Sequence, residues 1–214
     1  MKKTAKLGLT GAITTIALIA QPALAQGSGA FVEGTAGFGR ADLGNTAGLS
    51  VDNKDTNWGL AAGYMFNDMF GVEVGYRDLG SVSASASGAI TGTYYGTPYT
   101  AAGTLNASAS ADGWMLGARL NIPMGDKFSA QARLGWYKWE AEGRASATGS
   151  LTYGGTVYAG NVQASGSTDG TDLYWGLGAK YNITKQLGVG LGYTKFKLED
   201  VKVDSWDINV SYKF

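Results

Sequence analysis

The sequence predicts an all-β protein, an eight-stranded antiparallel up-and-down β-barrel that crosses a membrane. Apolar residues recur at every second position in eight segments, which is the period of a β-strand. The residues between them are mostly glycines and charged or polar side chains, and aromatic residues mark the segment ends. Because a face of glycine and charge cannot form an apolar core, the apolar face is expected to point outward into lipid.

The eight predicted strands follow one another along the chain, each defined by its apolar series. These series run from Val32 to Phe38, Trp58 to Phe66, Phe70 to Tyr76, Trp114 to Ile122, Phe128 to Trp136, Leu173 to Ile183, Leu187 to Tyr193 and Trp206 to Phe214. Each is close to the length that a tilted membrane strand needs. Aromatic pairs such as Trp58 and Phe66 bracket their strands, which predicts two girdles at the two membrane surfaces.

The connections between these strands alternate in length. Residues 67–68, 123–127 and 184–185 form short connections, whereas 40–57, 78–113, 140–172 and, less so, 197–205 form long ones. Short periplasmic turns and long external loops are typical of outer-membrane barrels, and an even strand count then leaves both termini in the periplasm. In the two longest connections, alternating Ser/Ala runs flank 93–99 and 152–158, which predicts two β-hairpin extensions above the membrane.

The N-terminus has the features of a secretory signal peptide. Lys2, Lys3 and Lys6 precede a short apolar stretch over 7–20, which ends before the triplet Ala23-Leu24-Ala25. Such a stretch is shorter than the roughly 20 residues of a spanning helix. We therefore predict a signal peptide over 1–25 and one outer-membrane barrel domain over 26–214.

The composition excludes several classes of protein. The chain has 34 glycines, no cysteine and no histidine, and its 17 basic and 17 acidic residues balance. Without His or Cys there is no Ser-His-Asp or Cys-His catalytic centre, no thiolate metal site and no disulfide. Balanced charge without a basic cluster gives no footprint for nucleic acid. We expect no cofactor and no enzymatic activity.

Several segments resemble the transmembrane domain of the outer-membrane protein A family, within the class of small outer-membrane β-barrels. The resembling segments are FGVEVGYRDLG (70–80), ARLNIP (118–123), ARLGWYKWEAEG (132–143), YNIT with LGVGLGY (181–193) and VSYKF (210–214). They cover most of the predicted strands and none of the external tips. The resemblance implies a location in the bacterial outer membrane.

The resemblance also implies a lumen closed by acidic and basic side chains. Glu73, Arg119 and Arg133 match positions of the family's network, whereas Lys180 stands in place of an acid and Gly190 in place of an arginine. Glu33 and Asp207 also point inward, so we expect a rebalanced network. Its six members are Glu33, Glu73, Arg119, Arg133, Lys180 and Asp207. Pairing is the expected outcome because unpaired charges in a narrow lumen are costly. A narrow solute or ion channel is the alternative, because inward glycines relieve crowding.

Two further groups are candidates for contact with other molecules. Five tyrosines at the predicted hairpin tips suit surface recognition, because Tyr gives a large contact area at small entropic cost; alternatively, they pack the hairpins together. They are Tyr94, Tyr95, Tyr99, Tyr153 and Tyr158. Tyr212 and the last residue, Phe214, resemble the signal read by the barrel-assembly machinery. We expect outer-membrane lipid and lipopolysaccharide as surroundings, a surface ligand or phage as external partner, and a monomer.

Overall fold

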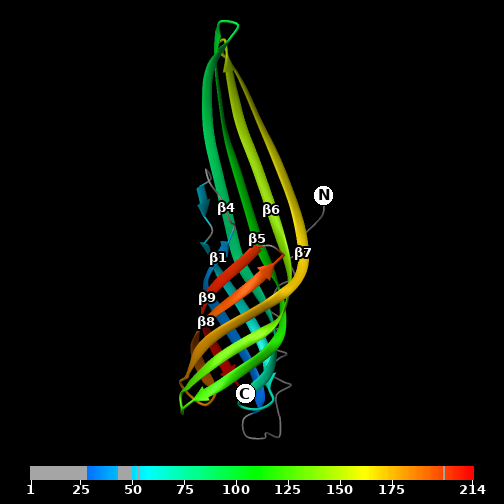
Figure 1. The fold of residues 1–214 in the computed structure, drawn as a ribbon, viewed down its shortest axis with the longest axis vertical. Helices are drawn as coiled ribbons and strands as arrows, with labels where there is room; N and C mark the ends of the chain where they lie inside the picture. Colours follow the sequence, from blue (N-terminus) through cyan, green and yellow to red (C-terminus); the bar gives the residue numbers. More distant parts are fainter. Residues whose placement is uncertain (1–27, 43–49, 53, 200) are drawn as a thin grey trace.

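The computed structural model describes residues 28–42, 50–52, 54–199 and 201–214, and the predicted signal peptide lies outside them. Eight long strands and one short strand make up the fold (Figure 1). They are β1 (Gly29–Asp42), β2 (Ser50–Asp52), β3 (Lys54–Met65), β4 (Phe70–Tyr94), β5 (Thr97–Met124), β6 (Phe128–Tyr153), β7 (Thr156–Asn182), β8 (Leu187–Leu198) and β9 (Val201–Lys213). None of the described segments is a helix of the length and apolarity needed to cross a membrane.

The eight long strands close into a ring in which every neighbouring pair is antiparallel. The order β4-β3-β1-β9-β8-β7-β6-β5 returns to β4 through the β4–β5 pairing. The first and last strands pair from Phe31 opposite Lys213 to Asp42 opposite Lys202. This closure confirms the predicted eight-stranded up-and-down barrel, and it leaves the ring no open edge.

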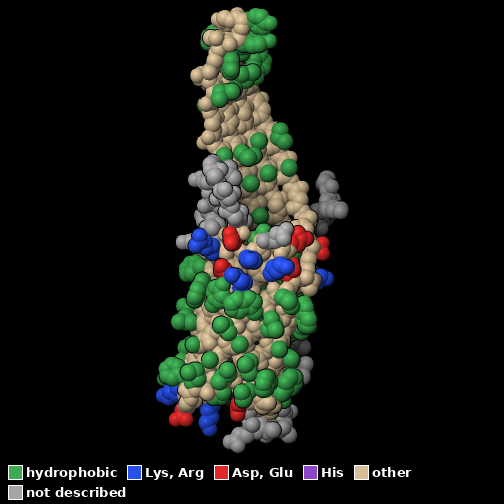
Figure 2. Space-filling view, viewed as in Figure 1, with side chains coloured by type: hydrophobic (Ala, Val, Ile, Leu, Met, Phe, Trp, Pro, Cys, Tyr) green, Lys and Arg blue, Asp and Glu red, His purple; other side chains and the backbone are tan. Residues whose placement is uncertain are grey.

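The two faces of the ring differ as the sequence alternation predicts. Leu60, Leu116 and Leu134 on the outer face are 54%, 59% and 58% exposed. On the inner face, Glu73 and Arg119 are buried. Figure 2 shows the outward hydrophobic side chains as a green belt between two bands of charged residues. An apolar exterior with charged groups sealed inside suits a surround of lipid.

Aromatic rings gather at both ends of the belt. Near the external end, the rings of Trp58, Tyr76 and Trp114 contact one another in sequence across three strands, with centroids 5.9 and 5.6 Å apart. At the end with short turns, Phe128 lies against Tyr181 at 5.0 Å. These contacts are the cross-strand neighbours of the register, and they form the two girdles expected at membrane surfaces.

Strands β4 to β7 continue far beyond the ring and form an extension above it (Figure 1). The β4–β5 hairpin turns at Tyr95 and Gly96, and the β6–β7 hairpin at Gly154 and Gly155, all with positive φ. Positive φ at both turn residues gives the two-residue turn that suits twisted strands. The two predicted hairpins are thus confirmed.

The two hairpins also join each other, which the sequence did not predict. Strands β5 and β6 stay paired from Tyr99 opposite Tyr153 down to Met124 opposite Phe128. Because both hairpins grow from adjacent ring strands and have nearly equal lengths, the β5–β6 and β6–β7 ladders continue from the ring into them without a register shift. The extension is therefore one sheet of four long strands in the order β4-β5-β6-β7, and the short strand β2 pairs with β4 at 83–85.

A bulge marks the place where β4 leaves the ring. The β4–β5 register shifts between Asp78 and Ser81, and Gly80 has a φ of 80°. The Asp55 carboxylate fixes this bulge, because it accepts hydrogen bonds from the Ser81 amide at 2.8 Å and hydroxyl at 2.7 Å. These hydrogen bonds lower the pKa of Asp55, since they stabilise its charged form.

Candidate functional site in the lumen and the extension

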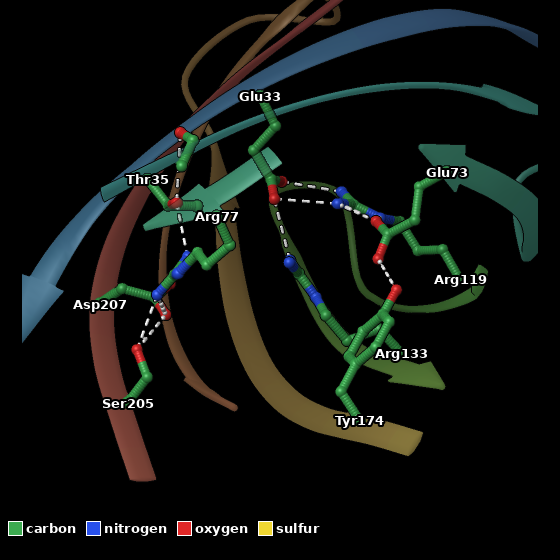
Figure 3. Close-up of polar contacts among 10 residues, drawn as sticks. Glu33, Thr35, Glu73, Arg77, Arg119, Arg133, Tyr174, Ser205 and Asp207 are labelled. Atoms are coloured by element: carbon green, nitrogen blue, oxygen red, sulfur yellow. Dashed lines mark hydrogen bonds and ion pairs between the residues drawn. The ribbon is translucent and has the colours of Figure 1, made fainter. Parts of the chain in front are cut away.

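Four of the six predicted network residues meet in one buried cluster, the lower cluster, shown in Figure 3. The Arg119 guanidinium donates to both Glu33 carboxylate oxygens, at 2.7 and 2.8 Å, and to Glu73 Oε2, at 2.6 and 2.8 Å. Arg133 Nη2 donates to Glu33 Oε1 at 2.9 Å. The four residues come from β1, β4, β5 and β6, so the cluster ties together opposite walls of the ring. Two carboxylates thus balance two guanidiniums.

Tyr174 completes the lower cluster, and two glycines make room for it. The Tyr174 hydroxyl donates to Glu73 Oε1 at 3.0 Å. A methyl group on Gly135 would lie 2.8 Å from the ring's Cε1, and one on Gly117 would overlap the hydroxyl. Inward glycine on β5 and β6 is therefore a condition for tyrosine to reach across the lumen.

A second charged group, the upper cluster, lies nearer the external end. Arg77 Nη2 donates to Asp207 Oδ2 at 2.8 Å, to Ser205 Oγ at 2.6 Å and to Asn57 Oδ1 at 2.9 Å, and Arg77 Nη1 donates to Thr35 at 2.6 Å. Asp207 therefore pairs with Arg77 and not with the other predicted network residues. Figure 3 shows the two clusters as separate groups.

An apolar layer packs against both charged clusters and continues toward the external end of the lumen. Phe196 lies between Tyr137 and Tyr174, at centroid distances of 5.0 and 5.8 Å. The Tyr137 hydroxyl donates to the Arg77 carbonyl at 3.0 Å, which links this layer to the upper cluster. The same buried group continues outward through Leu79, Trp139, Leu198 and Val203.

Lys180 lies apart from both clusters, contrary to the expectation that all six network residues pair. Within the described residues it makes no ion pair shorter than 4.0 Å. The reason is register: Lys180 lies opposite Ser129 on β6, closer to the short turns, and the Glu33 oxygens are already taken by two arginines. Its side chain lines a vestibule of about 820 Å³ at that end.

Four residues of the lumen clusters were not among the six predicted network residues: Arg77, Asn57, Ser205 and Tyr174. Arg77 belongs to the inward series of β4, and its position two places after Gly75 and four after Glu73 was the available signal. Asn57, Ser205 and Tyr174 also fall on inward positions, but their partners could not be predicted because these are set by the closure of the ring. Asn57 and Ser205, for example, lie 148 residues apart and hydrogen-bond at 3.0 Å.

The two faces of the extension continue the two faces of the ring. In the extension, however, the face that continues the lumen wall is apolar and the opposite face is polar. We call the side that continues the lumen wall the inner face; it carries the even-numbered residues of 82–94 and 156–166 and the odd-numbered residues of 97–109 and 143–153. This face holds only Gly, Ala, Val, Leu, Ile, Thr and Tyr. The opposite, outer face is rich in Ser and Thr and carries Asn106, Arg144 and Gln163.

The structure places the five predicted contact tyrosines at the end of the extension. Tyr94, Tyr95, Tyr153 and Tyr158 are exposed, and the Tyr94 and Tyr95 rings meet edge to face at 4.6 Å. Tyr99 is half-buried, because its ring covers Gly92 on the neighbouring strand. Tyr99 and Tyr153 are direct cross-strand neighbours, so part of this group joins the two hairpins.

The residues of the predicted assembly signal lie at the other end of the molecule. Tyr212 and Phe214 are exposed on the lipid-facing side of β9, with ring centroids 5.1 Å apart. The Phe214 amide donates to the Ala30 carbonyl at 2.9 Å, which holds the end of the chain against β1.

The chemistry of the lumen is that of paired acidic and basic side chains. Among the described residues, no group of three or more metal-ligating side chains lies close enough to hold a metal ion. The charged groups of the lower cluster pair with one another, so their ion pairs link strands across the lumen. Removing one member of such a buried pair costs about 3–5 kcal/mol, because its partner is left charged and unpaired.

The fold agrees with comparisons to known proteins. A family model described as the outer membrane protein beta-barrel domain matches residues 11–214. The chain belongs to this family. It is 28% identical over 197 residues to outer membrane protein A of Yersinia pseudotuberculosis, a match that covers 90% of this chain and 48% of that protein. The chain thus spans about half the length of this relative.

Solved structures of small barrels are also similar. Ail of Yersinia pestis, determined in complex with the heparin analogue sucrose octasulfate, has 19% identity and a TM-score of 0.46, covering 89% of this chain and 100% of Ail. The N-terminal barrel of Pseudomonas aeruginosa OprF has 14% identity and a TM-score of 0.47, covering 88% and 98%. The family and the curated relative locate this β-barrel in the outer membrane of Gram-negative bacteria.

Proposed function

We propose that this chain is a non-enzymatic outer-membrane barrel with a plugged lumen, and that it acts at the cell surface through its extension. The single observation that carries the proposal is the four-stranded sheet of β4 to β7, which stands clear of the ring with both faces exposed (Figure 1). A sheet of this size needs packing on one face for stability, and large exposed apolar surface marks interaction sites. The tyrosines at its end suit such contacts.

The plugged lumen is supported by the three layers inside the ring. The lower cluster, the upper cluster and the apolar layer that packs against both occupy the ring between the vestibule and the external end. An eight-stranded barrel is just wide enough for its own side chains, so these layers leave no room for a wide aqueous pore. External partners would then meet the extension and not the lumen.

A planar-bilayer measurement tests the plug. The wild-type chain should show no steady open channel, and Arg119→Met, which removes the centre of the lower cluster, should raise the frequency of open events. Arg144→Met, an exposed arginine of the extension, is the matched control and should behave as wild type. A large, steady conductance from the wild-type chain would favour the narrow channel instead.

The surface role needs a different variant. Replacing 82–109 and 143–166 by Asn-Gly turns removes the extension along one register row, because Val82, Ala109, Gly143 and Gly166 are cross-strand neighbours. The ring should still insert and show heat-modifiable gel mobility. Cells carrying this variant should lose adhesion to surfaces or to other cells. Unchanged adhesion in every assay would remove the surface role and leave a purely structural barrel.

A further inference from the structure

A row of four glycines crosses the middle of the inner face. Gly88 pairs with Gly103, Gly103 with Gly149, and Gly149 with Gly160, one on each strand of the extension. None of them has positive φ. A methyl group added to Gly88 or Gly160 would meet no atom within 4 Å. Among the described residues, only a methyl group on Gly103 would be tight, at 3.3 Å from the Thr148 carbonyl, so packing within the chain does not require glycine along the whole row. Glycine weakens a strand and often marks close approach by another backbone.

The rows on either side of the glycines are complementary to each other. Consider a second copy turned end for end about a two-fold axis along the glycine row, so that the two inner faces meet and each strand lies over its own copy. The row above the glycines then faces the row below, and large side chains face small ones. The facing pairs on the first three strands are Ile90 with Ala86, Ala101 with Leu105, and Leu151 with Ala147.

The next rows continue this pattern. Tyr99 and Tyr153 would face Ala107 and Ala145, two members of a row in which all four strands carry alanine. On β7 two larger side chains, Tyr158 and Val162, face each other, but they lie at the edge of the sheet. Interdigitated large and small side chains are how sheets pack face to face. The inner face carries no charged side chain, so the contact would bury no unpaired charge.

The size of the inner face fits a stable contact. Four strands ~4.8 Å apart span about 19 Å, and thirteen residues of strand at ~3.3 Å each span about 43 Å. The product is roughly 800 Å² on each copy, which is the size of a standard protein interface.

The end-for-end arrangement also brings the tip of one copy to the mouth of the other. Tyr94 lies three rows above the glycines and Val82 three rows below, so Tyr94 of one copy reaches Val82 of the other. There an apolar pocket of about 230 Å³ opens, lined in part by Val82, Ala111, Trp139 and Leu198. The exposed tyrosine tip of one copy would therefore lie against this pocket of the other copy.

We propose that the inner face binds a second copy of this chain that projects from a facing membrane, so that two extensions overlap tip to mouth. The proposal rests on the surface role proposed above and names its partner. The facing membrane follows from the direction of the extension, which rises above the ring along the molecule's long axis (Figure 1). Copies in one membrane point the same way and cannot meet end for end, so the expected monomer within one membrane is retained.

Single cysteines test the register directly, because the chain has none of its own. Gly103 lies on the proposed two-fold axis, so Gly103→Cys in two copies should face each other across sheets about 10 Å apart, a distance that a short bis-maleimide cross-linker spans and a disulfide does not. Thr104→Cys points to the outer face and is the matched control. Two vesicle populations carrying differently labelled protein are mixed, treated with the cross-linker and analysed by denaturing gel. We expect a mixed-label dimer for Gly103→Cys at least about tenfold above Thr104→Cys, because only the inner-face thiols are held together.

Light scattering of the mixed vesicles provides the second measurement. Wild type should tether vesicles, Leu105→Glu should reduce tethering at least about tenfold because it buries a charge in the contact, and Thr104→Glu should leave it unchanged. Heat-modifiable mobility shows that each variant is folded. Absent tethering by wild type, or equal cross-linking at 103 and 104, would overturn the proposal. Dimers formed only within one vesicle population would do the same. If removal of the extension still abolished adhesion of cells, the surface role would stand and only the partner would be wrong.

Discussion

Strand β5 runs from the lipid-facing ring into the water-exposed extension, and its two halves carry their apolar side chains on opposite faces. Below Asp112 its outward residues are Trp114, Leu116 and Ala118, and its inward side carries Arg119. Above Asp112 the outward residues are mostly Ser, Thr and Asn, and the inward ones are mostly Ala, with Gly103, Leu105 and Tyr99 among them. The pleat runs on without interruption between the halves, so the change lies only in the chemistry of each face. The outward face of β5 is therefore apolar where lipid surrounds the ring and polar where water surrounds the extension.

The largest expected difference between the halves concerns buried and exposed ion pairs. Arg119→Met should lower the free energy of unfolding by about 3–5 kcal/mol, because Glu33 and Glu73 lose their shared partner while buried. Arg144→Met removes an exposed pair with Glu142 at 3.5 Å and should change it by less than about 0.5 kcal/mol. Urea unfolding from lipid vesicles measures both. Equal losses of unfolding free energy in the two variants would mean that the ion pairs of the lumen are as exposed to water as the pair on the extension.

A charge on an exposed leucine should distinguish lipid from water. Leu116 and Leu105 lie on the same strand and are 59% and 48% exposed. Leu116→Lys should cost about 2–4 kcal/mol, because it places a charge in hydrocarbon, whereas Leu105→Lys should cost less than about 0.5 kcal/mol in dispersed protein. The same unfolding assay compares them. A cost for Leu105→Lys that matches Leu116→Lys would place the extension in lipid.

Glycines of the two regions should differ in their tolerance of a methyl group. Gly135→Ala crowds the β5 backbone at Leu116 and Gly117 as well as the Tyr174 ring, and should cost about 1–3 kcal/mol. Gly88→Ala meets open space in the extension and should be neutral or stabilise by up to about 1 kcal/mol. Thermal unfolding in detergent, followed by gel mobility, separates the two. A neutral Gly135→Ala would show that β5 and Tyr174 do not approach β6 this closely.

The smallest effect is expected at the bulge where the two regions join. The hydrogen bonds from Ser81 lower the pKa of Asp55 in the folded chain, so their contribution is complete above the ordinary pKa of an aspartate, about 3.8. It is lost as the pH falls through the lowered pKa. Asp55→Asn should lower the protection factor of the Ser81 amide, which is the ratio of its intrinsic exchange rate at the same pH to the observed rate, and the protection factor of acidified wild type should approach that of the variant. Exchange at Tyr76, within the ring, is the internal control. An unchanged protection factor of the Ser81 amide in Asp55→Asn would show that Asp55 does not hold the bulge.

Much of this fold follows from the sequence because period-two alternation is a local signal. Leu60 and Leu116 could be assigned to the lipid face from neighbouring residues alone, and so could the inward direction of Glu33 and Glu73. The pairing of inward charges could not be predicted in the same way. Arg77 and Asp207 meet across 130 residues, and the stagger of the ring decides that Asp207 reaches Arg77 and that Lys180 reaches neither cluster. The joining of the hairpins likewise depends on the β5–β6 register, which local sequence does not encode.

Fluorescence quenching along β5 tests most directly the claim that its faces change solvent at the mouth of the ring. Single cysteines at 104, 108, 116 and 118, all on the same side of β5, carry a fluorophore in protein reconstituted with a quencher on the lipid chains. The lipid quencher should act at 116 and 118 and leave 104 and 108 bright, while an aqueous quencher should show the reverse. Lipid quenching at 104 and 108, or its absence at 116 and 118, would contradict the account.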